Sequence, residues 1–286
     1  MPRLLAVGHV TWDAVQGRDV AGGSVCYAAL AARRLGWDAG VLSVAGPDFD
    51  PARELPGVAA FVAPGEVTTR FENDYARDGT RRQRLTACAG PLDFSMLPDA
   101  WRDPDVLLLA PVAGELSAYS AELFQAQVVG ALAQGWLREV DAGGDVHPCE
   151  WHDPAGCLAG VHAVVLSEHD LPNAGQRARA LLDQVPIVVL TRGWQGLLLH
   201  TRDARHEVPA LPREEVDPTG AGDVLAAAFL VRYHECGDLL EAAAFGVCAA
   251  SCAVEGVGTS TLGDRAEVER RLLQRERLIE DGEWEG

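Results

Sequence analysis

The sequence of 286 residues contains no lysine, because all 24 of its Lys and Arg positions are arginine. The absence of lysine excludes a GxxxxGK[ST] phosphate-binding loop, the strand lysine of protein kinases and Schiff-base chemistry. A phosphate group bound by this chain must therefore be held by backbone N–H groups, by arginine or by a metal ion.

Positive charge is also scarce overall, since 42 Asp and Glu residues give a formal net charge of -18. A surface that binds nucleic acid or an anionic membrane without sequence preference needs basic patches, so we expect neither partner. No apolar run approaches the length of a membrane span, and the apolar stretch within residues 1–10 is too short for a secretory signal. We therefore expect a cytoplasmic protein.

The seven cysteines are scattered along the chain, which argues against a disulfide framework and favours reduced core residues. His147, Cys149, His152 and Cys157 lie close enough in sequence to suggest a metal site. Their spacing is not that of a paired CxxC zinc site, and the nearby prolines indicate an irregular loop. We therefore do not predict zinc, and stoichiometric zinc in protein purified without added metal would overturn this interpretation.

Strand and helix patterns alternate along most of the chain. Apolar runs at 4–8 and 41–46 flank an alanine-rich helix at 25–35 that Gly36 closes, which predicts a βαβ unit. Continued alternation predicts one α/β domain over residues 1–286, with a mostly parallel sheet covered on both faces. The further predicted strands are 106–110, 161–166 and 186–190, and the further predicted helices are 118–135, 173–184, 238–254 and one from 264 onward.

Residues 67–75 and 81–86 have a composition that favours β-strands, with threonine and aromatic residues, and they flank an Asp78–Gly79 turn signal. This pattern predicts a polar hairpin that projects from the main body. We interpret it as part of a small β lid formed by residues 9–21 and 58–92.

Gly220-Ala221-Gly222 stands immediately before Asp223 and a strongly apolar, helix-forming run. The glycines predict a tight turn into a helix N-terminus, where unpaired N–H groups and the helix dipole favour an anion. A carboxylate at Asp223 can take a proton from a bound hydroxyl while those N–H groups hold the developing negative charge. The alternative is a tight strand-to-helix turn in which Asp223 only stabilises the helix start.

Two signatures occur in a fixed order: Gly22-Gly23 with the helix after it, and residues 217–223 with their alanine-rich helix. On these signatures residues 4–263 resemble the ribokinase-like (PfkB) family of carbohydrate kinases. The resemblance implies an α/β ribokinase-like fold, with a mostly parallel central sheet, helices on both faces and a small β-sheet lid. It also implies phosphoryl transfer from ATP with Mg2+, with Asp223 as general base and the backbone of Gly220, Ala221 and Gly222 as anion hole.

The resemblance assigns a substrate end to the N-terminal part of the chain. Asp13 is similar to the family's aspartate that grips substrate hydroxyls, and Gly22 and Gly23 let the backbone approach the substrate. Tyr27 stands where ribokinase has an asparagine, which argues against ribose and hints at a stacked or differently hydroxylated ring. Arg70 in the lid and Glu115 in the loop after residue 110 are further candidate substrate contacts, although a solvated hairpin face is the alternative for the lid.

The nucleotide end is expected after the later strands. Ser167, Glu168 and Asp170 occupy a segment linked in the family to magnesium and phosphate, with different side chains here, and solvated loop carboxylates are the alternative. Arg192 is a candidate phosphate contact in a turn that carries Gly193 and Gly196, and a surface ion pair is its alternative.

Small residues in the helix at 238–254 permit a flat slot for adenine, and they equally permit close helix packing. We assign Cys248 and Ala249 to that slot and Thr219 to the nucleotide. By resemblance, a monovalent cation such as K+ is expected near Asp217.

The resulting prediction is an ATP-dependent kinase that phosphorylates a hydroxyl of a small sugar or polyol, with an inositol-like or hexose-like substrate favoured. Its alternatives are a nucleoside kinase of the same fold and a catalytically silent ligand-binding homologue. By resemblance, the lid strands also suggest a homodimer.

Overall fold

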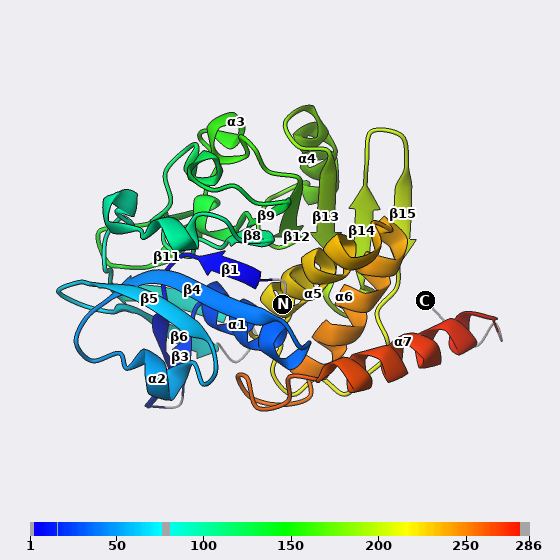
Figure 1. Cartoon of the computed structure of the whole chain (residues 1–286), viewed down its shortest axis with the longest axis horizontal. Coiled ribbons are helices and arrows are strands. Elements are labelled where there is room, and N and C mark those ends of the chain that lie inside the picture. Colours follow the sequence, from blue (N-terminus) through cyan, green and yellow to red (C-terminus); the bar gives the residue numbers. More distant parts are fainter. Residues whose placement is uncertain (1–2, 16, 76–80, 281–286) are drawn as a thin grey trace.

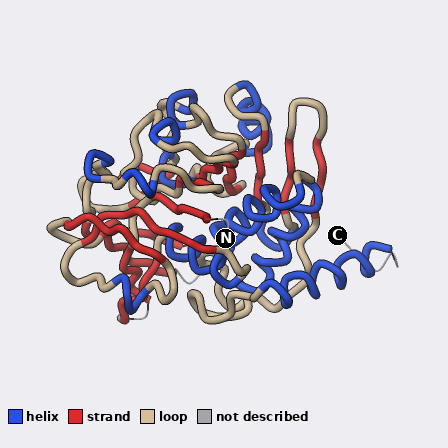
Figure 2. The backbone as a smooth tube through the Cα atoms, in the orientation of Figure 1, coloured by secondary structure: helices blue, strands red, loops and turns tan. Residues whose placement is uncertain are grey.

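A computed structural model describes residues 3–15, 17–75 and 81–280. Its centre is a nine-stranded sheet in the order β15-β14-β13-β12-β9-β8-β1-β4-β5. Every pairing from β13 to β5 is parallel, and the β14 and β15 pairings are antiparallel. Figure 2 shows the strands in red. The strands are β1 (Arg3–Val7), β4 (Asp38–Ala45), β5 (Ala59–Pro64), β8 (Val106–Leu109), β9 (Val128–Leu132), β12 (Ala163–Ser167), β13 (Ile187–Thr191), β14 (Leu197–His200) and β15 (Arg205–Val208).

Helices cover the two faces of this sheet unequally. Figure 1 shows the longer helices on one face, and the short helices α3 and α4 on the other. The helices are α1 (Ser24–Arg34), α2 (Pro51–Glu54), α3 (Pro154–Cys157), α4 (Ala174–Ala180), α5 (Ala221–Cys236), α6 (Leu239–Ala253) and α7 (Arg265–Glu280). Single 3-10 turns are η1 (Phe94–Met96), η2 (Asp99–Trp101), η3 (Ser120–Leu123), η4 (Gln134–Trp136), η5 (Leu181–Asp183) and η6 (Gly193–Gln195).

The sheet separates two hydrophobic cores, because successive side chains of a strand point to opposite faces. In β1, Leu4 and Ala6 pack with α1, α5 and α6, whereas Leu5 and Val7 pack with the opposite layer. This double burial explains why the central strands are apolar throughout rather than alternating.

A second, four-stranded sheet stands apart in the order β3-β2-β6-β7, formed by β2 (Thr11–Val15), β3 (Arg18–Gly22), β6 (Thr69–Tyr75) and β7 (Arg81–Ala87). Its presence beside a mostly parallel sheet confirms the predicted fold class. The predicted start of the lid at residue 58 is wrong, because β5 pairs with β4 in the large sheet. The Asp78–Gly79 turn lies outside the described residues.

The predicted helix at 118–135 is also wrong. The segment contains the 3-10 turn η3 and then β9, which lies between β8 and β12 in the middle of the sheet. All five residues of β9 are buried, because the strand is covered on both faces of the sheet. A short apolar run that contains alanine has the same pattern in a buried strand as in a buried helix, so the pattern does not distinguish them. Gly130 allows α5 to pack closely, since a Cβ there would lie 2.3 Å from a Leu230 methyl carbon.

The hairpin of β10 (Arg138–Val140) and β11 (Val146–Pro148) follows, and it reaches the small sheet. The amide of Leu85 in β7 donates to the carbonyl of Gly144 at 2.8 Å. The outer edge of the small sheet is therefore held by a loop of the main body.

The other predicted helices agree better with the structure. Residues 173–184 divide into α4 and η5, and 238–254 corresponds to α6, whose start Asp238 caps by accepting from the amides of Leu240 and Glu241. Among the described residues, no helix has the length and apolarity needed to cross a membrane, and no three His, Cys, Asp or Glu side chains gather as a metal site.

Candidate active site

A cleft of about 1300 Å³ opens at the carboxyl ends of the parallel strands, where ligands bind in open α/β sheets. Ser167 and Thr191 end β12 and β13 at its floor, and Val112 and Gln134 follow β8 and β9 there. One face of the small sheet forms the opposite wall through Asp13, Phe71 and Gln83.

The Gly220-Ala221-Gly222 turn forms the start of α5 as predicted, and it lines the cleft. Gly220 is the N-cap in the left-handed region, with φ of 77°. The first helical backbone bond runs from the Val224 amide to the Gly220 carbonyl at 3.0 Å, so helix geometry leaves the Gly222 and Asp223 amides without an intrahelical acceptor. These amides and the helix dipole make this end of the cleft favourable for an anion.

Tyr27 lies flat against this turn. A Cβ on Gly220 would lie 2.2 Å from the Tyr27 Cδ1 atom, so the ring occupies the space that any side chain would need. The Tyr27 residue lines the cleft while only 4% of its surface is exposed. The two sequence signatures, one on α1 and one on α5, are therefore in direct contact.

Asp223 lies half-buried at the floor of the cleft. Burial raises the pKa of its carboxyl from 3.8 to about 7, and the negative charges of Asp13 and Asp170 act in the same direction. The hydroxyl of Ser24 and the positive charge of Arg138 oppose the increase. A carboxyl group with a pKa near neutrality suits proton abstraction from an alcohol.

With Asp223 in its predicted role as general base, we expect kcat/KM for the acceptor to rise with pH through 7 and to level off above about pH 8, because a carboxyl accepts a proton only when ionised and the pKa of Asp223 is about 7. Initial rates between pH 5 and 9 at saturating donor would measure this profile. A profile that is flat from pH 5 upward would contradict the pKa assigned to Asp223.

The two glycines near the N-terminus have different surroundings, since Gly22 packs against Asp13 and Gly23 lines the cleft. A Cβ on Gly22 would lie 2.4 Å from Oδ2 of Asp13, and Thr11 donates its hydroxyl to Oδ1 at 3.0 Å. Gly23, with φ of 87°, is the N-cap of α1 and lines the cleft, whereas Gly22 packs behind Asp13. The N-termini of α1 and α5 thus open into the same cleft.

Arg70 does not lie where the sequence suggested. Its guanidinium binds Asp19, and it lies 3.8 Å from Asp48, on the face of the small sheet opposite to Phe71. Adjacent strand residues alternate between faces, so the predicted substrate face of β6 is the outer one. The described cleft lining contains Phe71 and Gln83 in place of Arg70.

Glu115 is a structural carboxylate. It is 3% exposed and accepts from the amides of His9 at 2.8 Å, Val112 at 3.0 Å and Ala113 at 2.8 Å. Because these amides occupy its oxygens, it fixes the crossing of two loops behind the cleft instead of contacting a substrate.

The predicted adenine slot lies on α6, but on a different face of the helix. Val247, Ala250, Ser251 and Val254 line the cleft at the i, i+3, i+4, i+7 spacing of one helix face. Cys248 and Ala249 are buried in the core, so their assignment to the slot is corrected to these four neighbours.

The turn after β13 is partly as predicted. Gly193 and Gly196 line the cleft, and Gly196 is needed because a Cβ would lie 2.2 Å from the carbonyl oxygen of Val208. Arg192 binds the carboxylate of Glu207, which was its structural alternative, and Glu207 rather than Arg192 lies in the described cleft lining.

The segment after β12 provides one candidate magnesium carboxylate. Asp170 and Ser167 line the cleft, and Asp170 accepts from the Ser167 amide at 2.7 Å. Burial raises the pKa of Asp170, which responds to the same Arg138 that acts on Asp223. Glu168 is absent from the described lining. One or two carboxylates beside phosphate oxygens suit Mg2+, which keeps several water ligands, so Asp170 fits that ion.

Asp217 holds two loops together. Its Oδ1 accepts from the Thr219 amide at 2.9 Å and its Oδ2 from the Gly258 amide at 3.4 Å. Thr219 itself lines the cleft, whereas Asp217 is not among the described lining residues. A monovalent cation beside Asp217 remains a prediction.

Arg138 is the functional candidate that the sequence reasoning missed. It lines the cleft, and its positive charge acts on the carboxyls of both Asp170 and Asp223. The helix predicted at 118–135 is the reason that Arg138 was not predicted as a site residue. A strand that ends at 132 would have placed Gln134 and Arg138 at the carboxyl edge of the sheet. Ser24, Trp194 and Arg213 also line the cleft and were not predicted.

Comparisons with known proteins agree with this architecture. A family model described as pfkB family carbohydrate kinase matches residues 158–265. A curated nucleoside kinase of Methanothermobacter thermautotrophicus is 26% identical across 94% of this chain and 95% of its own length.

Two solved structures share the fold over nearly their whole length. A pyrophosphate-dependent kinase in the ribokinase family, complexed with a pyrophosphate analog and myo-inositol, superposes with a TM-score of 0.75 at 20% identity and covers 93% of this chain and 99% of its own. The nucleoside kinase of Methanocaldococcus jannaschii gives 0.73 at 20% identity, with coverage of 96% and 99%. Likeness at this identity establishes the fold only.

Proposed function

We propose that the chain is a kinase of the pfkB family, as the family model over residues 158–265 and the nucleoside kinase relative support. From this premise we propose that it transfers the γ-phosphoryl group of ATP to a hydroxyl of a small sugar or polyol, inositol-like or hexose-like. The observation that carries the proposal is the position of Asp223, a carboxyl group with a pKa of about 7 at the N-terminus of α5, beside the Gly220 turn. A cytoplasmic location, where ATP is available, is part of the same proposal.

The proposed acceptor binds between the small sheet and Tyr27, with hydroxyls on Asp13. Asp223 takes the proton of the attacking hydroxyl, and the α5 amides hold the negative charge of the phosphoryl group in flight. Mg2+, held by Asp170 and the donor phosphates, would neutralise phosphate charge and align the donor. Arg138 supplies a fixed positive charge to the same floor and keeps Asp223 ionised more readily than burial alone would allow.

The small sheet serves as the proposed lid. Phe71 and Gln83 cover the acceptor side and would exclude water that could otherwise accept the phosphoryl group. Since the β7 edge is bound by Gly144 of the same chain, a homodimer formed by lid strands would pair through the other edge, β3.

ATP is the proposed donor because the cleft extends beyond the phosphate turn into an apolar slot. Val247, Ala250 and Val254 of α6 form one side of this slot, and Leu211 and Pro212 lie on its other described border. A pyrophosphate donor, as in one structural relative, would leave this space unused.

A nucleoside acceptor is the second candidate, because the curated relative that matches nearly the full chain is named a nucleoside kinase. Two aromatic rings beside the acceptor position, Tyr27 and Phe71, are suited to stacking on a base.

We expect ADP formation from ATP with at least one inositol or hexose, and little turnover with nucleosides. Assays across inositols, hexoses, pentoses and nucleosides test acceptor and donor together, with ADP release measured when ATP is the donor and orthophosphate release measured when pyrophosphate is the donor. Preferential turnover of nucleosides would favour the second candidate. Ligand binding without any turnover would favour a silent homologue and contradict the proposed kinase.

A further inference from the structure

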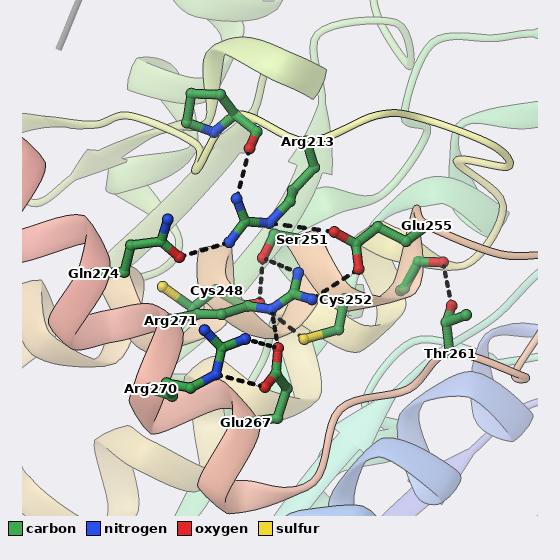
Figure 3. Close-up of polar contacts among 12 residues, drawn as sticks. Arg213, Cys248, Ser251, Cys252, Glu255, Thr261, Glu267, Arg270, Arg271 and Gln274 are labelled. Carbon is green, nitrogen blue, oxygen red and sulfur yellow. Dashed lines mark hydrogen bonds and ion pairs between the residues drawn. The ribbon is translucent and has the colours of Figure 1, made fainter. Parts of the chain in front are cut away.

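Two arginines of the C-terminal helix α7 are almost completely buried, at 7% exposed for Arg271 and 8% for Arg275. Arginine is rarely buried unless it is paired, because removing its charge from water is costly. Figure 3 shows two α7 side chains that reach other elements: Arg271 extends to α6, and Gln274 extends to the segment that contains Arg213. The buried arginines of α7 therefore help to connect three elements: α7, α6 and the segment that contains Arg213.

Arg271 is the centre of this network (Figure 3). Its Nη1 donates to the hydroxyl of Ser251 at 3.1 Å, its Nη2 lies 2.7 Å from Glu255, and its Nε lies 2.6 Å from Glu267. Ser251 lines the cleft on the slot face of α6, so one contact of the guanidinium is a cleft wall residue.

The network continues to the other side of the slot. The second oxygen of Glu255 lies 3.2 Å from Nε of Arg213. The Nη2 of Arg213 donates to Oε1 of Gln274 in α7 at 2.8 Å. Arg275 donates to the carbonyl of Pro209 at 3.2 Å. Arg213 and Pro209 line the cleft, so α7 binds both borders of the slot: α6 through Ser251 and the 209–213 segment through its two ends.

We propose that Arg271 is a positioning residue that fixes the width of the slot for the nucleoside part of the donor, and thereby sets donor affinity. The inference rests on the proposed function, since it takes ATP as the donor. Among the described residues, Arg271 contacts the cleft residue Ser251 directly and the cleft residue Arg213 through Glu255, and Asp223 is not part of these contacts. Its removal therefore acts on donor binding and not on the chemical step.

Arg271→Met is expected to raise KM for ATP about tenfold or more, because α7 loses its contact with Ser251 and Glu255 loses one of its two arginine partners, which loosens the two borders of the slot. We expect kcat at saturating ATP and KM for the acceptor to change by less than about twofold. Arg270→Met is the matched control, because Arg270 binds the same Glu267 from a side chain that is 62% exposed. The control should retain the wild-type KM for ATP.

Binding of inorganic tripolyphosphate distinguishes a change in the slot from a general loss of structure, because tripolyphosphate has the phosphates of ATP and lacks its nucleoside. Calorimetry without acceptor should show ATP binding weakened about tenfold in Arg271→Met and tripolyphosphate binding unchanged. Equal weakening of both ligands, or unchanged ATP binding, would overturn the inference. Wild-type protein that binds no ATP would instead count against the proposed function itself.

Glu255→Gln keeps the test decisive if Arg271→Met does not fold. The amide retains the shape of Glu255 but removes the charge between Arg213 and Arg271. It should weaken ATP binding in the same selective way, with a smaller change, and a melting curve would establish that the variant is folded. A folded Glu255→Gln protein with wild-type ATP affinity would overturn the inference.

Discussion

Asp223→Asn is expected to lower kcat by about 10³-fold to 10⁴-fold, because the amide cannot accept the proton of the attacking hydroxyl. ATP affinity should change little, since the backbone amides of the α5 turn remain in place. Steady-state rates and calorimetric ATP binding would measure the two quantities. A variant that keeps near-normal turnover would show that Asp223 is not the base.

The stability of the same variant is the internal control. The raised pKa of Asp223 means that the folded state binds this proton more tightly than the unfolded chain, so wild-type stability decreases as pH rises from about 4 to about 7. Asparagine carries no such charge. Thermal melting should therefore show Asp223→Asn to be at least as stable as the wild type at pH 8, which would exclude unfolding as the cause of lost activity.

Gly220→Ala is expected to lower kcat/KM by about 100-fold or more while leaving the fold intact. The new Cβ would lie 2.2 Å from the Tyr27 ring, at a backbone with φ of 77° that alanine adopts poorly. Either the turn or the ring must move, and both border the reacting groups. Steady-state kinetics and a melting curve would measure the two effects separately.

Gly237→Ala is the matched control for this substitution. Gly237 ends the same helix in the same left-handed region, with φ of 70°, but a Cβ there meets nothing within 4 Å. It should lose stability through backbone strain and retain catalysis. If Gly220→Ala behaves like Gly237→Ala, contact with Tyr27 is not what positions the turn.

The predictions that succeeded depended on short-range chemistry. A glycine turn before a helix and a capping aspartate are encoded by neighbouring residues, so the starts of α1, α5 and α6 were readable from the sequence. The two signatures also implied a shared site, and the structure places Tyr27 of one against Gly220 of the other.

The failures arose where burial removes the pattern that sequence reasoning needs. All of β9 and most of α6 are buried, so neither an alternation of polar and apolar residues nor an amphipathic stripe shows which face lines the cleft and which face packs in the core. The slot face of α6 was therefore assigned to Cys248 instead of Ser251. Arg70 and Glu115 failed for another reason: their partners, Asp19 and the His9 amide, are distant in sequence and no local rule reveals them.

The N-termini of α1 and α5 open into one cleft of a protein whose formal net charge is -18. An approaching anion is thus repelled by the whole molecule at long range and attracted only within a few ångströms of the floor. The negative surface discriminates between ligands by charge. A nucleotide that is already complexed with a divalent cation is repelled less than the free polyanion. Selection between the two would begin in solution, before any side chain of the site makes contact.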